Sequence, residues 1–365
     1  MKKYFIPVLI FIGFVGLYLG YARSFDNNYL FLPVWDVEHY LSISEIGYES
    51  FPCVEGVHFP AGEICGNVGW YPGWPLVVKA LRPLFGGSSP AAFIGLAFIF
   101  TLAAFLLFFK MMIDRYDIGC AVPALLALAL GPASFYLITG FPYAMLAFLF
   151  LLYLFLLERN SQPLRNTALF LVALLLSLTY PTGILIALVP VVRYLRLNRP
   201  IKPLLKDYRH WLKLAGYVAP FVLGPLLLWS YFYFKFDDFF LQLHFQAKYQ
   251  RTWSFPLWVM VKSLFTAPLF GPENLTQIWF GLIFIVFARY RVAAELWVLA
   301  LVLFFFSPAT GTMMSLYRHY IIILPAYIIL GTAERPLWLR LAVIAAGLII
   351  SLGVMFPAFM HYRLI

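Results

Sequence analysis

The residues best suited to chemistry stand close together near the start of the chain. Within residues 35–48, which read WDVEHYLSISEIGY, four ionisable side chains occur in ten positions: Asp36, Glu38, His39 and Glu45. Only 12% of all residues are charged, so such a cluster is unusual here. A carboxylate within hydrogen-bond reach of a hydroxyl can take its proton while the oxygen attacks another atom. We therefore interpret the segment as carrying a catalytic carboxylate, and the simple alternative is a solvated loop.

The elements that position this segment must be unusually apolar. The chain has 365 residues, of which 63% are hydrophobic, and its mean hydropathy is +0.86. Soluble domains average about 45–50% apolar residues. Many apolar runs are long enough to cross or nearly cross a bilayer, and they are continuous rather than alternating, which excludes a β-barrel. The sequence predicts an all-α polytopic membrane protein that forms a single domain over residues 1–365.

The distribution of basic residues predicts how the chain is oriented. The formal net charge of +10 does not indicate nucleic acid as a partner, because Lys and Arg gather between the apolar runs. Lys2 and Lys3 place the N-terminus in the cytoplasm, and we favour an uncleaved signal-anchor over a cleaved signal peptide for the first apolar run. The densest basic run, over residues 193–213, also lies inside. Orientation alone explains that run, and binding of anionic lipid headgroups is the less favoured additional role.

About eleven transmembrane helices follow, with the C-terminus outside. They are expected near residues 4–21, 91–109, 118–139, 144–157, 167–179, 182–192, 214–234, in the run before Arg289, and near 292–306, 320–333 and 342–356. Residues 167–179 and 182–192 are short, and they form either two tilted spans or a broken hairpin that lines a cavity. Two large external loops, 22–90 and 235–274, carry interfacial helices, one of them within residues 67–85.

The cysteines lead to one open question about the first loop. Cys53 and Cys65 both lie in it, and outside the cytoplasm they form either a disulfide or two free thiols. Cys120 stands at the start of an apolar run, and we expect it to be a small buried residue. No Cys or His spacing in the sequence indicates a zinc site.

Several motifs follow one another along the chain, and each falls on the predicted outer side of the membrane. They are Trp35-Asp36 with His39-Tyr40 and Gly47-Tyr48, the stretch GWYPGWP at 69–75, residues 245–251 with Pro256, and residues 315–320 with Pro325. Together they resemble the PIG-V-type mannosyltransferases, membrane enzymes of the GT-C glycosyltransferase class. Two positions depart from the family pattern. The turn at 141–144 (FPYA) lacks an acidic residue, and no Arg precedes the turn at 180–183 (YPTG). A distant prokaryotic-type relative with a different donor or acceptor is the reading we favour.

The resemblance implies an activity and its partners. It implies inverting transfer of a sugar, with mannose favoured, from a polyprenyl-phosphate donor such as dolichyl phosphate mannose. The acceptor is a hydroxyl of a glycan, glycolipid or protein on the non-cytoplasmic face of the lipid bilayer. A bacterial or archaeal plasma membrane is favoured, or the endoplasmic reticulum membrane if the source is eukaryotic. No cofactor is certain beyond the lipid-linked donor, and a divalent metal is left open but not favoured.

The acidic segment then supplies the catalytic residue. Asp36 is the candidate general base, and Trp35 beside it anchors the segment at the interface or stacks on a sugar. Glu38 and His39 are candidate substrate-binding residues. On a helix Glu38 points away from Asp36, whereas on an extended segment the two share a face, where Glu38 could join a cation site.

The leaving phosphate requires cations on the same side. Arg318 is the leading candidate, because a guanidinium matches phosphate oxygens in a forked geometry. His319, Arg251 and Lys248 are further candidates, and the plain alternative for Arg318 is an interfacial anchor. We predict that Asp36 and Arg318 converge on one pocket. The competing functions are a transporter or flippase of a lipid-linked solute, and a non-catalytic scaffold.

Overall fold

The computed structural model describes residues 5–25, 34–53, 62–159, 163–198, 200, 206–249, 251–288 and 292–361. These residues form helices and one two-stranded sheet. Lys2, Lys3 and Arg289, which the predicted topology uses, lie outside the described residues.

The chain divides into two compact units that alternate along the sequence. The first contains Met1–Leu32, Leu96–Leu151 and Trp253–Ile365, and the second contains Pro33–Gly95 and Leu152–Thr252. Two long helices, α4 (Ser89–Arg115) and α6 (Tyr143–Leu157), contribute residues to both. The single domain expected from the sequence stays a prediction.

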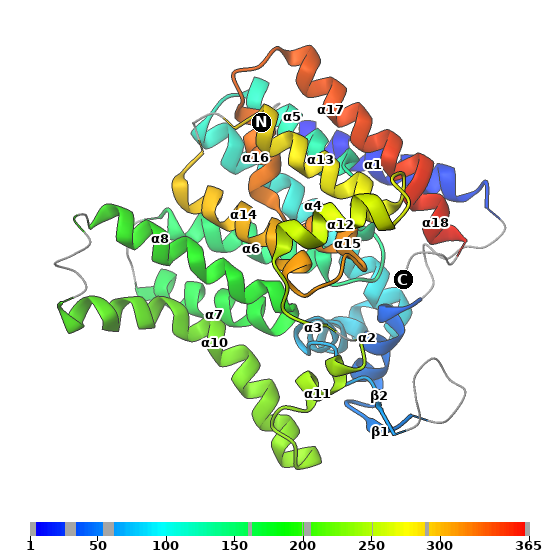
Figure 1. Cartoon of the computed structure of the whole chain (residues 1–365), viewed down its shortest axis with the longest axis vertical. Coiled ribbons are helices and arrows are strands. Elements are labelled where there is room, and N and C mark those ends of the chain that lie inside the picture. Colours follow the sequence, from blue (N-terminus) through cyan, green and yellow to red (C-terminus); the bar gives the residue numbers. More distant parts are fainter. Residues whose placement is uncertain are drawn as a thin grey trace. The chain divides into compact units, whose positions relative to one another are not determined.

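The first unit is a helical bundle. Besides its share of α4 and α6 it contains α1 (Phe5–Ala22), α5 (Ile118–Leu130), η3 (Ser134–Leu137), α12 (Pro256–Thr266), α13 (Pro272–Val286), α14 (Ala294–Ala309), α15 (Leu316–Tyr320), α16 (Leu324–Thr332), α17 (Leu337–Ile350), the π-helical turn η5 (Ser351–Met355) and α18 (Phe356–Met360). In Figure 1, α16 runs beside α5. A glycine permits this contact, because a Cβ at Gly331 would meet the Cβ of Ala124 at 2.5 Å.

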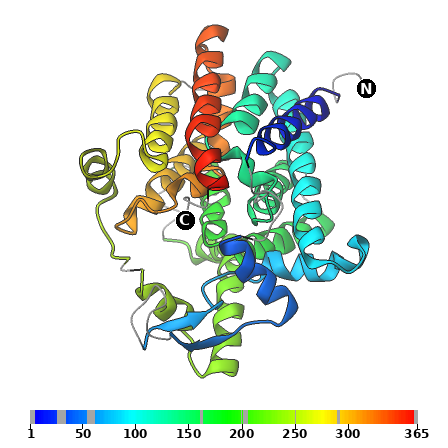
Figure 2. The same ribbon diagram turned by 90° about the vertical axis from the view of Figure 1, so that its right-hand side faces the viewer.

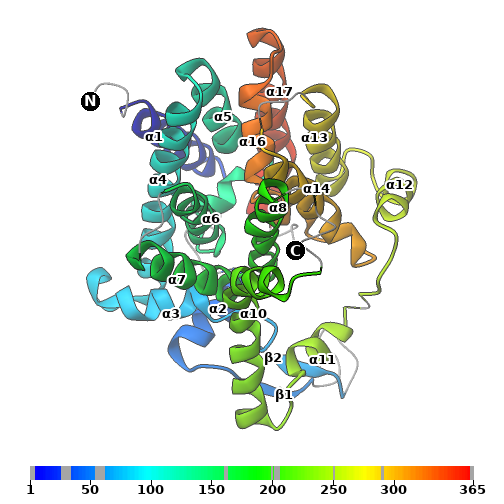
Figure 3. The same ribbon diagram turned by 90° about the vertical axis from the view of Figure 1, so that its left-hand side faces the viewer.

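The second unit holds the acidic segment. It contains α2 (Asp36–Glu45), β1 (Ser50–Pro52), β2 (Ile64–Gly66), α3 (Gly73–Leu81), η2 (Arg82–Phe85), α7 (Pro163–Thr179), η4 (Pro181–Ala187), α8 (Leu188–Leu197), α10 (Tyr208–Phe236) and α11 (Leu241–Ala247). β1 and β2 pair antiparallel, with Phe51 opposite Cys65. Figure 3 shows α7 and α8 beside the first half of α10, with α11 and the two strands near its C-terminal end.

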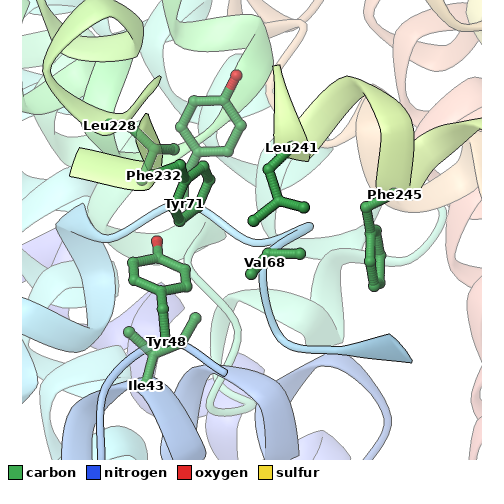
Figure 4. Close-up of a cluster of buried hydrophobic side chains, with 8 residues drawn as sticks. All are labelled: Ile43, Tyr48, Val68, Tyr71, Leu228, Phe232, Leu241 and Phe245. Atoms are coloured by element: carbon green, nitrogen blue, oxygen red, sulfur yellow. The ribbon is translucent and has the colours of Figure 1, made fainter. Parts of the chain in front are cut away.

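A buried apolar cluster fixes α2 against α10. Its members come from α2 and the residues after it, from the segment before α3, and from α10 and α11: Ile43, Tyr48, Val68, Tyr71, Leu228, Phe232, Leu241 and Phe245 (Figure 4). Tyr48 and Phe232 meet edge to face at 4.9 Å between ring centroids, a favourable aromatic geometry. The hydroxyl of Tyr48 also donates to the carbonyl oxygen of Trp70 at 2.7 Å. The cluster therefore holds α2 and the segment around Trp70 in one place.

The helices agree with a membrane protein, but the number of spans is not confirmed. Among the described residues four helical segments are long and apolar enough to cross a membrane: Phe5–Ala22, Ser89–Arg115, Tyr208–Phe236 and Leu337–Met360. Other apolar helices have 10–17 residues. The span expected at 118–139 ends as a helix at Leu130, because Gly131 precedes a proline and adopts an extended conformation. Within the span expected at 320–333, α16 covers Leu324–Thr332, and Tyr320 is the last residue of α15. Eleven spans and two external loops stay predictions.

Candidate functional site

The position of Asp36 depends on a strained residue before it. Trp35 has φ 51° and ψ −124°, and α2 begins at the next residue. Non-glycine residues adopt such backbone angles at a cost of order 1–3 kcal/mol, and they occur often at functional sites. Asp36 is half-buried in the first turn of α2, whereas Glu38 is exposed. Because the segment is helical, the extended alternative is wrong, and Glu38 does not share a face with Asp36.

Beside α2 lies a pocket of about 360 Å³, which we call the loop pocket. Residues from α2, the β1–β2 hairpin, the segment after it and α11 line it: His39, Ser42, Glu49, Phe51, Cys65, Gly66, Asn67, Trp70, Phe245, Lys248 and Tyr249. Its volume is within the range of small-ligand sites, about 300–1,000 Å³. Figure 2 shows the hairpin, α2 and the C-terminal end of α10 together in the lower part of the view.

The wall of the loop pocket is organised by one buried amide. Asn67 is 2% exposed, and its Nδ2 donates to Ser42 Oγ at 2.9 Å and to the carbonyl oxygen of Gly47 at 3.0 Å. Its Oδ1 accepts from the backbone N–H of Glu49 at 2.8 Å. Three hydrogen bonds to a side chain with this burial fix the end of α2 against the hairpin. Sequence reasoning missed Asn67, although it stands two residues before Gly69, the first residue of the motif at 69–75.

Aromatic rings form another wall. The rings of His39 and Trp70 are stacked, with 3.6 Å between centroids and 19° between planes. Trp70 meets Phe245 edge to face at 5.6 Å. Such rings offer apolar faces to the C–H groups of a sugar, while the tryptophan N–H is a donor. Trp70 was part of a sequence motif but was not selected as a site residue.

Lys248 brings a cation to the loop pocket. Its Nζ lies 3.6 Å from the centroid of the Phe245 ring and donates to the carbonyl oxygen of Ile64 at 2.9 Å. Partial burial lowers the pKa of Lys248 to about 8, against the opposing effect of Glu63. Burial also lowers the pKa of His39, with Asp36 raising it and Lys248 lowering it further. At neutral pH the pocket therefore holds a neutral imidazole beside an ammonium group.

A disulfide closes the loop next to this pocket. Cys53 and Cys65 are joined, with Cα atoms 5.0 Å apart, and Cys65 lines the pocket. The bond ties the end of β1 to β2. Cys120 is a free cysteine.

The predicted site residues of the second unit are only partly brought together. His39 and Lys248 line the loop pocket, and Asp36 is close enough to His39 to affect its pKa. Trp35, Glu38 and Arg251 do not line it. The guanidinium of Arg251, whose side chain is exposed, lies 5.8 Å from the ring of Tyr249, which does.

Arg318 and His319 lie in the first unit, on the single-turn helix α15. The residue before α15, Ser315, has φ 60°, a second strained residue next to a predicted site. Burial raises the pKa of Tyr317 to about 12, with Arg318 lowering it and Glu273 raising it. The carboxylate of Glu273 accepts a hydrogen bond from the backbone N–H of Ser315. Sequence reasoning missed Glu273, an acid in the first turn of an apolar helix. The convergence of Arg318 with Asp36 stays a prediction.

The described residues hold no group of three or more His, Cys, Asp or Glu side chains arranged to bind a metal ion. Whether the protein binds a divalent metal ion therefore stays open.

Comparisons with known proteins give a distant likeness to solved structures. No protein-family model matches the chain, and no curated protein sequence matches it. Among solved structures, the chain is similar to an oligosaccharyltransferase from Archaeoglobus fulgidus in complex with zinc and sulfate, with 12% sequence identity and a TM-score of 0.47. The match covers 98% of this chain and 52% of that one, so the chain spans about half the length of that structure. A likeness at this score carries no argument about activity.

Proposed function

We propose that the chain is a membrane glycosyltransferase of the GT-C type, distantly similar to the PIG-V-type mannosyltransferases. It transfers a sugar, with mannose favoured, from a polyprenyl-phosphate donor to an acceptor hydroxyl on the non-cytoplasmic face. The observation that carries the proposal is the loop pocket. It combines aromatic faces, a buried amide network and a lysine, and it lies beside the only half-buried acid of α2.

The transfer requires a base that takes the proton of the acceptor hydroxyl, and cations that stabilise the negative charge of the leaving phosphate. The acceptor oxygen attacks the anomeric carbon on the face opposite the phosphate, and its proton passes to the carboxylate of Asp36. The bond between the anomeric carbon and the phosphate oxygen breaks, and the polyprenyl phosphate leaves with the electron pair. One displacement inverts the configuration at the anomeric carbon. Cations that meet the leaving phosphate lower the barrier, because they stabilise charge that develops in the transition state.

The composition of the loop pocket suits a sugar phosphate. Stacked rings at His39 and Trp70 bind the apolar face of a pyranose. Glu49 and Ser42 offer hydrogen-bond partners for its hydroxyl groups. Lys248 is a point charge for the phosphate. Arg251, in the same unit, is a further candidate cation for the phosphate. The sequence-based assignment of Arg318 and His319 to phosphate binding stays a prediction.

The distribution of charge argues against the transporter or flippase alternative. Transport pathways place ionisable groups deep in the bilayer. In the four long apolar helices of the described chain, charged residues stand only near the ends. They are Lys110, Asp114 and Arg115 in α4, Arg209, Lys213 and Lys235 in α10, and Arg340 in α17. A bilayer-embedded enzyme that works at the membrane surface needs no deeper charges.

The test is a transfer assay on the full chain in detergent or nanodiscs. Radiolabelled mannosyl polyprenyl phosphate is offered with a soluble acceptor, such as an alkyl mannoside, and product is analysed by α- and β-mannosidase digestion. We expect a labelled glycoside whose anomeric configuration is opposite to that of the donor. A panel of donors with glucose, galactose or N-acetylglucosamine then ranks the sugars.

Two results would contradict the proposal. Product with retained configuration would exclude the single displacement. Donor that crosses proteoliposome membranes without any transfer, across the whole donor panel, would favour the flippase alternative.

A further inference from the structure

The second unit contains another pocket, lined by residues of α7, α8, the first half of α10 and the C-terminal end of α6. It has a volume of about 510 Å³, and we call it the basic pocket. It is lined by Tyr153, Leu157, Arg165, Asn166, Leu169, Phe170, Pro190, Arg193, Tyr194, Leu197, Lys213, Gly216, Tyr217 and Pro220. None of the residues used in the proposed reaction belongs to this set.

Three cations from three different helices meet in the basic pocket. Arg165 lies on α7, Arg193 on α8 and Lys213 on α10. None of the described lining residues carries a carboxylate. Bringing like charges into one concave surface raises the free energy of the protein, and a bound anion removes that cost. Orientation in the membrane requires basic residues on one side, but it does not require them to line one pocket.

The two guanidinium groups make few hydrogen bonds to the protein. Arg193 reaches the carbonyl oxygen of Leu157 through Nη1 at 3.4 Å, which is long for a hydrogen bond. Arg165 donates through Nη1 to the carbonyl oxygen of Arg159 and through Nη2 to Asn166 Oδ1. The Nε of Arg165 is buried without a hydrogen-bond partner. A buried N–H without a partner destabilises the protein, and an acceptor oxygen in the pocket removes that cost.

Apolar side chains of the lining are open to the outside. Phe170 is 42% exposed and Leu197 is 65% exposed. On α10 itself, Trp211 and Leu212 are more than half exposed close to Lys213. Apolar side chains next to basic ones suit a molecule with an acidic head and hydrocarbon chains.

We propose that the basic pocket binds the phosphate headgroup of an anionic phospholipid, with Arg165, Arg193 and Lys213 around the phosphate. Leu169, Phe170 and Leu197 contact the acyl chains. The pocket contains the first and the last residue of the basic run 193–213, Arg193 and Lys213, and the sequence predicts a cytoplasmic location for that run. The inference does not depend on the glycosyltransferase proposal, because no residue is shared between them.

The test measures lipid binding to the purified full chain by native mass spectrometry. Phosphatidylglycerol and phosphatidylcholine with the same acyl chains are titrated against the wild type, and we expect tighter binding of phosphatidylglycerol. The double variant Arg165→Gln and Arg193→Gln should weaken phosphatidylglycerol binding at least tenfold, with phosphatidylcholine unchanged. Arg209→Gln is the matched control, because Arg209 precedes Lys213 by one helical turn on α10 and does not line the pocket. The Arg209→Gln variant should lose less than twofold of its affinity for phosphatidylglycerol.

A second variant separates binding from folding. A Cβ at Gly216 would meet no atom within 4 Å, so Gly216→Leu fills the pocket without removing charge. It also replaces a glycine inside a helix, which favours folding. We expect weaker phosphatidylglycerol binding with an unchanged or higher melting temperature.

Three results would overturn the inference. One is equal loss of phosphatidylglycerol binding in the Arg209→Gln variant and in the double variant, which would mean general surface attraction. Another is unchanged binding in Gly216→Leu. A third is displacement of phosphatidylglycerol by inorganic phosphate or glycerol phosphate at micromolar concentration, which would assign the site to a water-soluble phosphate.

Discussion

The two pockets of the second unit differ in how their polar groups are held, although helix α10 takes part in both regions. The basic pocket involves its first half, at Lys213 and Gly216. The loop pocket lies beyond its second half, where Phe232 packs in the buried cluster and Lys235 donates to the carbonyl oxygen of Tyr48 at 2.6 Å. The helix has 29 residues and is roughly 43 Å long.

The difference lies in preorganisation. Around the loop pocket a disulfide, the Asn67 hydrogen bonds and stacked rings fix the lining groups. The arginines of the basic pocket are half-buried, and the lysine is exposed. Chemistry needs groups held within a fraction of an ångström, whereas attraction of an anionic headgroup needs only charge. The more rigid loop pocket is therefore the expected place of a reaction.

The largest effect is expected from the disulfide. Replacing both Cys53 and Cys65 by Ser should lower the stability of the folded protein by about 3 kcal/mol, because the unfolded chain regains the freedom of the loop. Thermal unfolding followed by fluorescence-detected size exclusion measures it. Cys120→Ser is the control, since Cys120 is free. A double variant as stable as Cys120→Ser would show that the bond does not hold the loop pocket.

A smaller loss is expected from Asn67→Ala, at about 2 kcal/mol. The change removes three hydrogen bonds and leaves the N–H of Glu49 and the carbonyl of Gly47 without that partner. Asn166→Ala in the basic pocket should change stability by less than about 0.5 kcal/mol, because Asn166 is exposed. Equal shifts in melting temperature for the two variants would remove the contrast between the pockets.

The smallest effect concerns pH. The pKa of Lys248 is lowered to about 8, so the ammonium charge is present below pH 8 and is lost above it. If Lys248 contacts the donor phosphate, the KM for donor should rise about tenfold between pH 7 and pH 9.5. Arg keeps its charge over this range, so Lys248→Arg should flatten the profile. A rise of the same size in Lys248→Arg would assign the effect to another group.

The sequence predicts those helix boundaries that are set by residues close together in the chain. The first helix was expected at 4–21 and is found at Phe5–Ala22, because its boundaries follow one uninterrupted apolar run. The break between 179 and 182 occurs at Tyr180, which precedes Pro181 and is extended. The disulfide, in contrast, could not be distinguished from two thiols by spacing alone.

The loop pocket was harder to predict, because its groups meet through tertiary contacts. Asn67 reaches Ser42 across 25 residues, and Lys248 reaches Ile64 across 184. No sequence periodicity encodes such pairs. Glu273 was missed for the same reason, since its contact with Ser315 exists only where α13 meets the turn before α15.

Asp36 as the catalytic base is the central claim, and one measurement tests it most directly. The rate of sugar transfer is compared for wild type, Asp36→Asn and Glu45→Gln at equal amounts of folded protein. Glu45 is the matched control, because it is an exposed acid at the other end of α2. Loss of a general base reduces rates by about 10²–10⁴-fold, so we predict that Asp36→Asn is at least 100-fold slower while Glu45→Gln is unchanged. Full turnover by Asp36→Asn would contradict the account.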